Sequence, residues 1–376
     1  MSSVMKLSEV VDVVIGVDTH VATHSAAAVE VATGAVLGEI TVDTTAEGYA
    51  ELVDFAEELA TTNAALQAWA IEGTASHGRG LAVHLRSLSQ AGELVIELDR
   101  PERARRRNGE KSDPLDAIRA AREAISRAKV GTPRGAGPNP EHAAIRQALA
   151  TRLAIRRSAV QAAGDARRQL FSAILTAPAP VRARLRNLKT DALLTKLTKL
   201  TTLRPGAAWA SADVETAHTV ACLQTWARRI KDLTAEAEDH EKHIKILIKA
   251  WRPDRLEEVG IGPIVAATVL CAWGYTGRIH SEAAFAKLAG TSPIEANSGQ
   301  VFARHRLNRY GDRRLNCAIH TIAITRQRHD QDTRDYTERR TAQGKNPREI
   351  RRCLKRYIAR ELYRRLESPP AALDGA

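Results

Sequence analysis

The stretch Val11-Asp12-Val13-Val14-Ile15-Gly16-Val17-Asp18 decides the fold of the N-terminal region. Its β-branched side chains form a short apolar run, which predicts a buried strand with Asp18 at its carboxyl end. Four further strands and two helices are expected, the strands at 24–31, 36–42, 66–71 and 94–98 and the helices at 45–59 and 81–88. Three strands followed by helices and strands in alternation predict an α/β domain with a mixed sheet.

A second stretch, Lys111-Ser112-Asp113-Pro114-Leu115-Asp116-Ala117, predicts the start of a helix. Ser112 or Asp113 suits the N-cap, and a proline is tolerated at the first helical position. Asp113 and Asp116 are three residues apart, so both carboxylates lean to one side of that turn. Taken alone, this pattern favours an ordinary acidic first turn that complements the helix dipole.

Acidic residues also stand where two of the expected strands end, Asp18 after the first and Glu72 after 66–71. Functional side chains gather at the carboxyl ends of strands in such sheets, so these two can converge with Asp113 and Asp116. A buried cluster of acids is costly unless metal ions or protons neutralise it. The four acids therefore predict a Mg²⁺ site, with two ions about 4 Å apart. A basic run that attracts phosphate precedes them, and it includes Arg105, Arg106, Arg107 and Lys111.

Composition limits the class of protein. At 376 residues with 44% hydrophobic content, the chain is long enough for two or three domains. The four cysteines are far apart and form no CxxC pair, which argues against a zinc site or a disulfide framework and for a reducing cytoplasm. An apolar run of membrane-spanning length and a signal-peptide core are both absent, so no membrane association is expected.

The formal net charge of +12 is concentrated at one end of the chain. Residues 304–365 hold 19 of the 56 Lys/Arg and 7 of the 44 Asp/Glu, so the remaining 37 basic and 37 acidic residues balance. A balanced chain with one basic end favours a nucleic-acid partner over a merely solvated helix face. Aromatic residues make up only 4%, which favours contact with the phosphate backbone over base stacking.

The middle region, 131–251, is expected to be a Gly/Pro-rich linker at 131–140 followed by helices at 141–174, 181–203 and 214–251. Apolar positions alternate by three and four along the last helix, at Leu223, Trp226, Ile230, Leu233, Ala237, His240, Ile244, Leu247 and Trp251. This heptad pattern predicts an antiparallel coiled coil with the earlier helices, or an oligomer contact. An ordinary long helix packed on its own chain explains it equally well.

The C-terminal region, 252–376, carries two Gly-containing segments. Gly260-Ile261-Gly262 resembles a helix-hairpin-helix element, whose backbone amides can approach a phosphate, although a plain connection between helices explains the glycines nearly as well. Ser298 is expected in a polar loop between two helical stretches, beside Gly299, where a hydroxyl is free to act as a nucleophile. For a lone serine, a turn or cap role is the commoner explanation, and neither a Ser-His-Asp pattern nor a Gly-x-Ser-x-Gly elbow surrounds it.

Together, Val-Ile-Gly-Val-Asp18, Ile71-Glu72-Gly-Thr and Lys-Ser-Asp113-Pro-Leu-Asp116 resemble the RuvC-like DEDD domain of a family of insertion-sequence transposases. This is the family of bridge-RNA-guided serine recombinases related to the pilin-gene invertases. The segment from Ala289-Gly290 through Ser298-Gly299, followed by Arg309-Tyr-Gly311-Asp-Arg313-Arg314-Leu315, is similar to the transposase domain of the same family. The sequence departs from the pattern near the first acid, where His20 and His24 replace the usual Lys, and after Glu72.

The resemblance implies an N-terminal RNase H/RuvC-like mixed-sheet domain at 8–130, central coiled-coil helices at 131–251 and a helical transposase domain at 252–376. It implies that Asp18, Glu72, Asp113 and Asp116 hold Mg²⁺, and that Ser298 is the nucleophile, with Ser292 as the alternative. It further implies a cytoplasmic bacterial enzyme that acts on donor and target double-stranded DNA with a non-coding guide RNA. In this family the acidic domain of one subunit is thought to meet the serine domain of another, which requires a dimer and favours a tetramer on DNA.

Basic residues on the C-terminal helices are expected to contact phosphates, namely Arg306, Arg309, Arg313, Arg314, Arg352, Lys355 and Arg356. Two other classes of protein stay open. A RuvC-like metal-dependent structure-specific nuclease would use the acids with water as the nucleophile. A non-catalytic nucleic-acid-binding protein would use only the basic end.

Overall fold

The structure is a computed structural model of the 376-residue chain. It describes residues 6–63, 66–74, 76–88, 94–98, 113–127, 131–133, 135, 137–199, 214–295, 305–307 and 311–369. The chain divides into two compact units, Met1–Ala143 with Ala272–Ala284, and Ala144–Cys271 with Phe285–Ala376. Each unit is described by itself.

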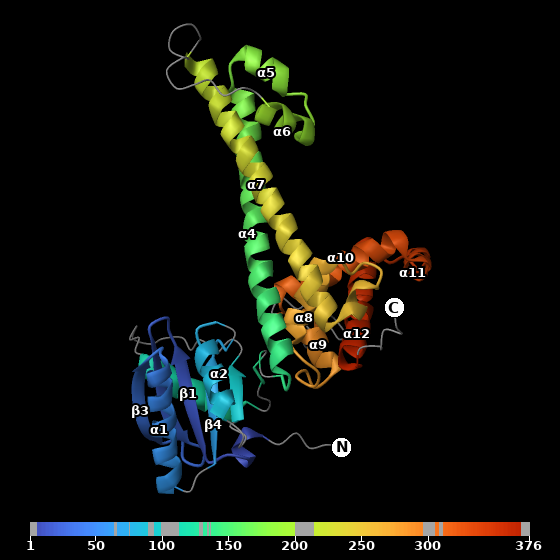
Figure 1. The fold of residues 1–376 in the computed structure, drawn as a ribbon. Coiled ribbons are helices and arrows are strands. Elements are labelled where there is room, and N and C mark those ends of the chain that lie inside the picture. Colours follow the sequence, from blue (N-terminus) through green and yellow to red (C-terminus); the bar gives the residue numbers. More distant parts are fainter. Residues whose placement is uncertain are drawn as a thin grey trace, which may run out of the picture. The chain divides into compact units, whose positions relative to one another are not determined.

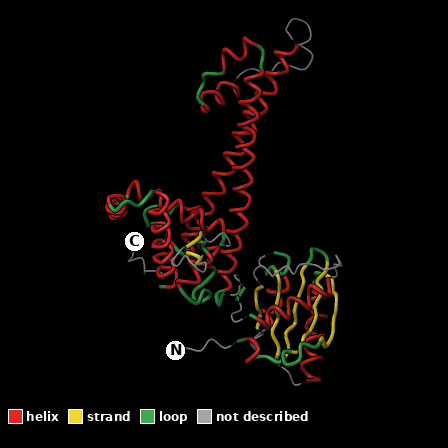
Figure 2. The backbone as a smooth tube through the Cα atoms, turned by 180° about the vertical axis from the view of Figure 1, so that it is seen from behind, coloured by secondary structure: helices red, strands yellow, loops and turns green. Residues whose placement is uncertain are grey.

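The first unit is built on a five-stranded mixed sheet in the order β3-β2-β1-β4-β5 (Figures 1 and 2). The bounds are β1 Val13–Thr19, β2 Thr23–Glu30, β3 Val36–Asp43, β4 Gln67–Glu72 and β5 Leu94–Leu98. β1, β2 and β3 pair antiparallel, whereas β4 runs parallel to both β1 and β5. The helices of this unit are α1 Ala46–Asn63, α2 Arg79–Leu88 and α3 Asp113–Ser126, and a short 3₁₀ turn, η1 Leu7–Glu9, precedes the sheet.

Helices cover both faces of this sheet, because alternate residues of the buried strands point to opposite sides. Val14 of β1 packs with α3 on one face, while Ile15 packs with α1 and α2 on the other. The near-continuous burial of β1 follows from this two-sided packing, since five of its seven residues are buried. The predicted mixed α/β sheet is therefore confirmed.

Among the residues that the structure describes, the second unit is helical apart from one short pair of strands. Its long helices are α4 Pro140–Thr176 and α7 Val214–Trp251, with α5 Ala179–Leu185 and α6 Thr190–Lys199 packed at one end. The remaining elements are η2 Pro253–Leu256, α8 Pro263–Trp273, α9 Glu282–Leu288, β6 Pro293–Glu295, β7 His305–Leu307, α10 Arg313–His329, α11 Gln331–Ala342 and α12 Pro347–Glu367. None of the helices within the described ranges is long and apolar enough to cross a membrane.

The helices α4 and α7 lie side by side in antiparallel directions (Figure 1). Arg156 on α4 pairs with Glu241 on α7 at 2.8 Å, while Trp226, nearer the start of α7, donates to Gln169, farther along α4. Of the heptad positions, Leu223, Ile230, Ala237, Ile244 and Trp251, each seven residues apart, are buried. The intervening positions are only partly buried. The long helix thus packs on its own chain, and a supercoil or an oligomer contact stays a prediction.

Two expectations for the helical region are wrong. The single helix expected at 181–203 is two helices, because the chain turns at residues 186–189 between α5 and α6. Asn187 and Thr190 lie at this break, and both residue types favour turns and helix starts over helix interiors. The region after α9 was expected to be loop between helices, yet it contains the antiparallel pair β6 and β7. Strands of three residues are too short to show an alternating pattern.

Candidate active site

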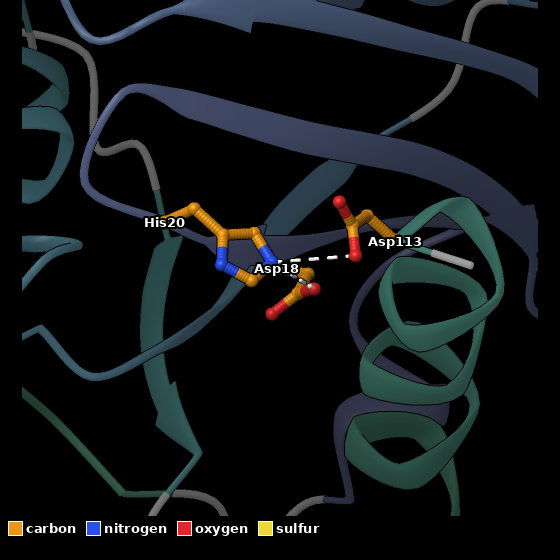
Figure 3. A group of neighbouring side chains, drawn as sticks. All are labelled: Asp18, His20 and Asp113. Carbon is orange, nitrogen blue, oxygen red and sulfur yellow. Dashed lines mark hydrogen bonds and ion pairs between the residues drawn. The ribbon is translucent and has the colours of Figure 1, made fainter. Parts of the chain in front are cut away.

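At the carboxyl end of β1, the side chains of Asp18, His20 and Asp113 come together (Figure 3). His20 Nε2 lies 3.2 Å from Asp18 Oδ2 and 3.4 Å from Asp113 Oδ1. One ligand atom from each residue lies within 4.8 Å of the others. The Asp18 side chain is 14% exposed, whereas that of Asp113 is 45% exposed. The cluster is therefore buried where it meets the sheet and open to solvent where it meets α3.

Close packing of α3 on β1 brings Asp113 to Asp18. A Cβ built on Gly16 would lie 2.1 Å from the carbonyl oxygen of Ala117 and 2.4 Å from the backbone nitrogen of Ala121. Only glycine permits this approach, because any side chain at position 16 collides with the backbone of α3. Gly16 and Asp18 are two residues apart on one strand and share a face, so the first turn of α3 is held against the end of the strand.

Glu72 lies on the neighbouring strand β4, on the same face as Asp18. The register pairs Val17 with Ile71, so Asp18 and Glu72 follow at the next position of each strand. Since Ala70 packs in the core cluster shared with α3, alternation along β4 places Glu72 toward α3 as well. The Thr19 hydroxyl donates to the Glu72 carbonyl oxygen at 3.0 Å and ties the two strand ends together. Glu72 is not part of the close group of three.

Asp116 stands one turn along α3 from this group and forms an ion pair with Arg119 at 2.6 Å. Burial, opposed by His20 and reinforced by the negative charges of Asp116 and Asp113, raises the pKa of Asp18 above its usual value. The Asp18 carboxylate is held near two other acids, so its negative charge is disfavoured. A divalent cation would offset this repulsion, and paired carboxylates are suitable ligands for Mg²⁺ or Mn²⁺.

Sequence reasoning noted His20 but gave it no place in the site. Its spacing of two residues from Asp18 was the available signal, because residues i and i+2 at the end of a strand face the same way. His24, the other histidine that departs from the family pattern, has a different position. It is fully buried, its ring stacks on that of Tyr49 at 5.8 Å, and burial lowers its pKa. His24 therefore belongs to the packing of the domain.

Several predicted residues lie outside the described residues: Arg105, Arg106, Arg107, Lys111, Ser298 and Arg309. The elements on either side of Ser298 are described. β6 and β7 pair antiparallel with Pro293 opposite Leu307. Arg306 lies in β7. Ser292, the alternative nucleophile, precedes β6 in a turn where its backbone N–H donates to the Ala286 carbonyl at 3.2 Å.

The predicted phosphate-binding residues on the helices have different surroundings. Arg313 and Arg314 open α10 and are exposed, and Arg352 is exposed on α12. Arg356 is partly buried. Lys355 donates to the Asn316 side-chain oxygen at 2.5 Å, and Asn316 in turn donates to the Ala289 and Gly290 carbonyls. Through Asn316, Lys355 is therefore linked to the turn before β6, and burial lowers the pKa of this lysine.

A comparison with protein-family models identifies one segment of the chain. Residues 255–338 match the model described as "Transposase IS116/IS110/IS902 family". This match supports an insertion-sequence transposase. The transposase-family segment runs from the end of η2 into α11 and includes the β6–β7 hairpin. A DNA-processing enzyme that binds DNA is implied, and a divalent metal is suggested for it. No curated protein matches the chain.

Glu258, near the start of the transposase-family segment, lies at the centre of a second charged cluster. Its side chain is 5% exposed and pairs with Arg255 at 2.7 Å, Arg365 at 3.2 Å and Arg326 at 3.6 Å. Arg326 also pairs with Glu361 at 2.6 Å. This Glu258 cluster joins the segment after η2 to α10 and α12, so part of the basic charge of the C-terminal helices is used within the fold.

Proposed function

We propose that this protein is the transposase of an insertion sequence, a site-specific recombinase that cleaves and exchanges DNA strands through a Ser298 phosphoserine intermediate. The observation that carries the proposal is the meeting of Asp18 and Asp113 at the carboxyl end of β1, in a chain whose residues 255–338 match a transposase family. An RNase H/RuvC-like assignment of the first unit is supported by its strand order, with three antiparallel strands followed by two parallel ones.

In the proposed mechanism, Asp18 and Asp113 would hold a divalent cation, preferably Mg²⁺, and Glu72 and Asp116 would help to hold a second ion. Such a cation, when bound, would stabilise the negative charge on the phosphate that is attacked. The Ser298 hydroxyl attacks phosphorus, and the Oγ–P bond forms as the bond from phosphorus to the leaving deoxyribose oxygen breaks. The proton that the hydroxyl loses ends on that oxygen. The covalent intermediate conserves the phosphodiester energy for joining to another strand.

The partners of the enzyme are also proposals. Donor and target DNA duplexes bind to the basic helices, and an element-encoded RNA selects them by base pairing. Asp113 and Ser298 lie on different units of the chain. A site composed of the acidic unit of one subunit and the serine loop of another accounts for both residues, and it requires at least a dimer.

The first experiment is to express the chain with its native flanking DNA, purify it and sequence the nucleic acid that co-purifies. We expect one abundant non-coding RNA from the flank. With that RNA and its matching DNA, wild-type protein should form a covalent protein–DNA adduct that survives denaturation. Heterogeneous fragments alone would contradict guidance by RNA.

Four substitutions in the acidic site and two in the serine region test the chemistry. Asp18→Ala, Glu72→Ala, Asp113→Ala, Asp116→Ala and Ser298→Ala should abolish recombination and retain DNA binding. Ser292→Ala is the matched serine control and should retain the adduct. Normal cleavage by Ser298→Ala would identify the RuvC-like nuclease that uses water. Wild-type recombination by any acid variant would exclude that acid from catalysis.

A further inference from the structure

A trough on the second unit, lined by α4, α8 and α10, has an unusual charge pattern. It has a volume of about 500 Å³, and its walls include Arg156 and Arg157 from α4 and Arg313 and Arg314 from α10. Its floor is apolar, with Ile264 and Val265 of α8. Among the described residues that line it, none is acidic. Four arginines therefore converge on a concave surface without a carboxylate inside it.

The four arginines differ in whether they form an ion pair. Arg156 forms an ion pair with Glu241 of α7, so its charge is balanced. Arg157, Arg313 and Arg314 make no ion pair with any other residue that the structure describes. Partial burial and the nearby positive charge of Arg314 lower the pKa of Arg157 from its usual value. Two guanidinium groups thus approach each other without an anion between them, and an anionic ligand would relieve this repulsion.

The trough continues toward the glycine turn that the sequence suggested as a phosphate-binding hairpin. A second hollow of about 380 Å³ shares Ile264, Val265 and Thr321 with the trough and reaches Gly260 and Gly262. Its lining also includes Glu241 and Glu258, and each of these carboxylates is paired with an arginine. Gly260 has a φ of +85°, and a Cβ on it would lie 3.2 Å from the Ile322 carbonyl oxygen. A Cβ on Gly262 would meet nothing within 4 Å. The backbone at Gly262 is therefore open to a ligand.

We propose that this trough binds the phosphodiester backbone of a nucleic acid, with Arg157 and Arg314 as phosphate ligands and the Gly262 turn as a further contact. The planar guanidinium fork is suited to bidentate contact with phosphate oxygens. The apolar floor suits the sugars between successive phosphates. Thr268 and Thr321 donate to carbonyls of their own helices, so arginine side chains supply the donors. This assignment rests on the proposed function, because it names the surface by which the enzyme holds its substrate or guide.

The test is a titration of the full-length protein against a fluorescent DNA duplex of arbitrary sequence and against an RNA hairpin of similar length, over a range of salt. We expect Arg157→Ala/Arg314→Ala to weaken binding by about tenfold or more for each lost guanidinium. The slope of log affinity against log salt should fall by about 1.8, because two phosphate contacts are lost. Loss with only one probe would support the site and identify whether DNA or RNA occupies it.

Two further variants separate this site from a general effect of charge. Arg228→Ala/Arg229→Ala removes two exposed arginines from α7 and should bind as the wild type does. Arg157→Lys/Arg314→Lys keeps both charges, and should keep the salt slope while losing part of the affinity. Equal binding of both probes by the wild type and the Arg157/Arg314 alanine variant would overturn the trough assignment alone. A wild-type protein that bound neither probe would overturn this assignment together with the proposed function.

Discussion

Two charged clusters in this molecule have opposite character. In the acidic cluster at the carboxyl end of β1, Asp18 and Asp113 approach each other, and His20 lies beside both. In the Glu258 cluster, one buried carboxylate is surrounded by three arginines. The first arrangement places like charges together, and the second balances unlike charges inside the fold. Converging like charges are costly in a folded protein and are tolerated where a ligand neutralises them.

The comparison separates charges that act on a partner from charges that hold the structure. The acidic cluster and the arginine trough each carry an excess of charge of one sign on a surface open to solvent. The Glu258 cluster has its carboxylate 5% exposed and uses Arg326 and Arg365 to connect helices. A cluster of the second kind is expected to affect stability when it is broken, and a cluster of the first kind is expected to affect ligand binding.

The largest effect on stability is expected at Glu258. Glu258→Ala removes the carboxylate and leaves three arginine side chains around an empty position, which should destabilise the protein by about 3–5 kcal/mol. Urea denaturation monitored by circular dichroism measures this. The adjacent Glu257 is exposed, so Glu257→Ala is the matched control and should change stability little. Equal effects of the two substitutions would mean that the Glu258 ion pairs contribute no more than surface charge.

The second effect concerns Gly16, which sets the distance between the sheet and α3. Gly16→Ala places a methyl group 2.1 Å from the Ala117 carbonyl oxygen, so α3 must move away from β1. We expect a loss of about 1–3 kcal/mol, as for other overpacked positions. Because Asp113 moves with the helix, Mn²⁺ affinity measured by calorimetry should fall as well.

At Gly164 on α4, replacement of glycine by alanine is expected to have the opposite effect on stability. A Cβ there would lie 3.7 Å from the nearest atom, the end of the Arg168 side chain. Gly164→Ala should therefore stabilise the protein by about 0.5–1 kcal/mol through higher helix propensity. If Gly16→Ala were also stabilising, α3 would not be held against β1 as the structure describes.

Much of this arrangement could be predicted because its signals are local. The apolar run at Val13–Val17 and its terminal Asp18 predicted the strand, and the Pro114 segment predicted the start of α3. The sequence also located both long helices, and along the second the heptad spacing of Leu223, Ile230 and Ala237 extends over many turns. Long periodic segments carry more information than short ones.

The features that could not be predicted from the sequence depend on contacts between residues far apart in the chain. That Lys355 bonds to Asn316 follows from the packing of α12 on α10, and its sequence position on a basic face suggested only phosphate contact. The pairing of Arg326 and Arg365 with Glu258 is likewise tertiary. His20 joined the site because Asp113 was brought to it by α3. The roles of Glu72, Asp116 and Ser298 in the chemistry stay predictions.

The smallest effect is expected from Asp18→Asn in metal-free protein. The raised pKa of Asp18 means that its ionisation disfavours the folded state, so stability falls as the pH rises through its titration range. Asparagine carries no charge and avoids this loss. We therefore expect Asp18→Asn to melt slightly above the wild type at neutral pH in a chelating buffer. The difference should vanish below pH of about 3.9, where aspartate is protonated in the unfolded chain as well.

Added Mn²⁺ or Mg²⁺ should reverse this order. A cation that binds only the folded state raises the melting temperature, and the wild type offers Asp18 as a ligand whereas the variant does not. Asp54→Asn, which removes an exposed carboxylate from α1, controls for the loss of one charge and should follow the wild type under both conditions. A lower melting temperature for Asp18→Asn in the chelating buffer would instead place Asp18 with Glu258, among the charges that hold the fold together.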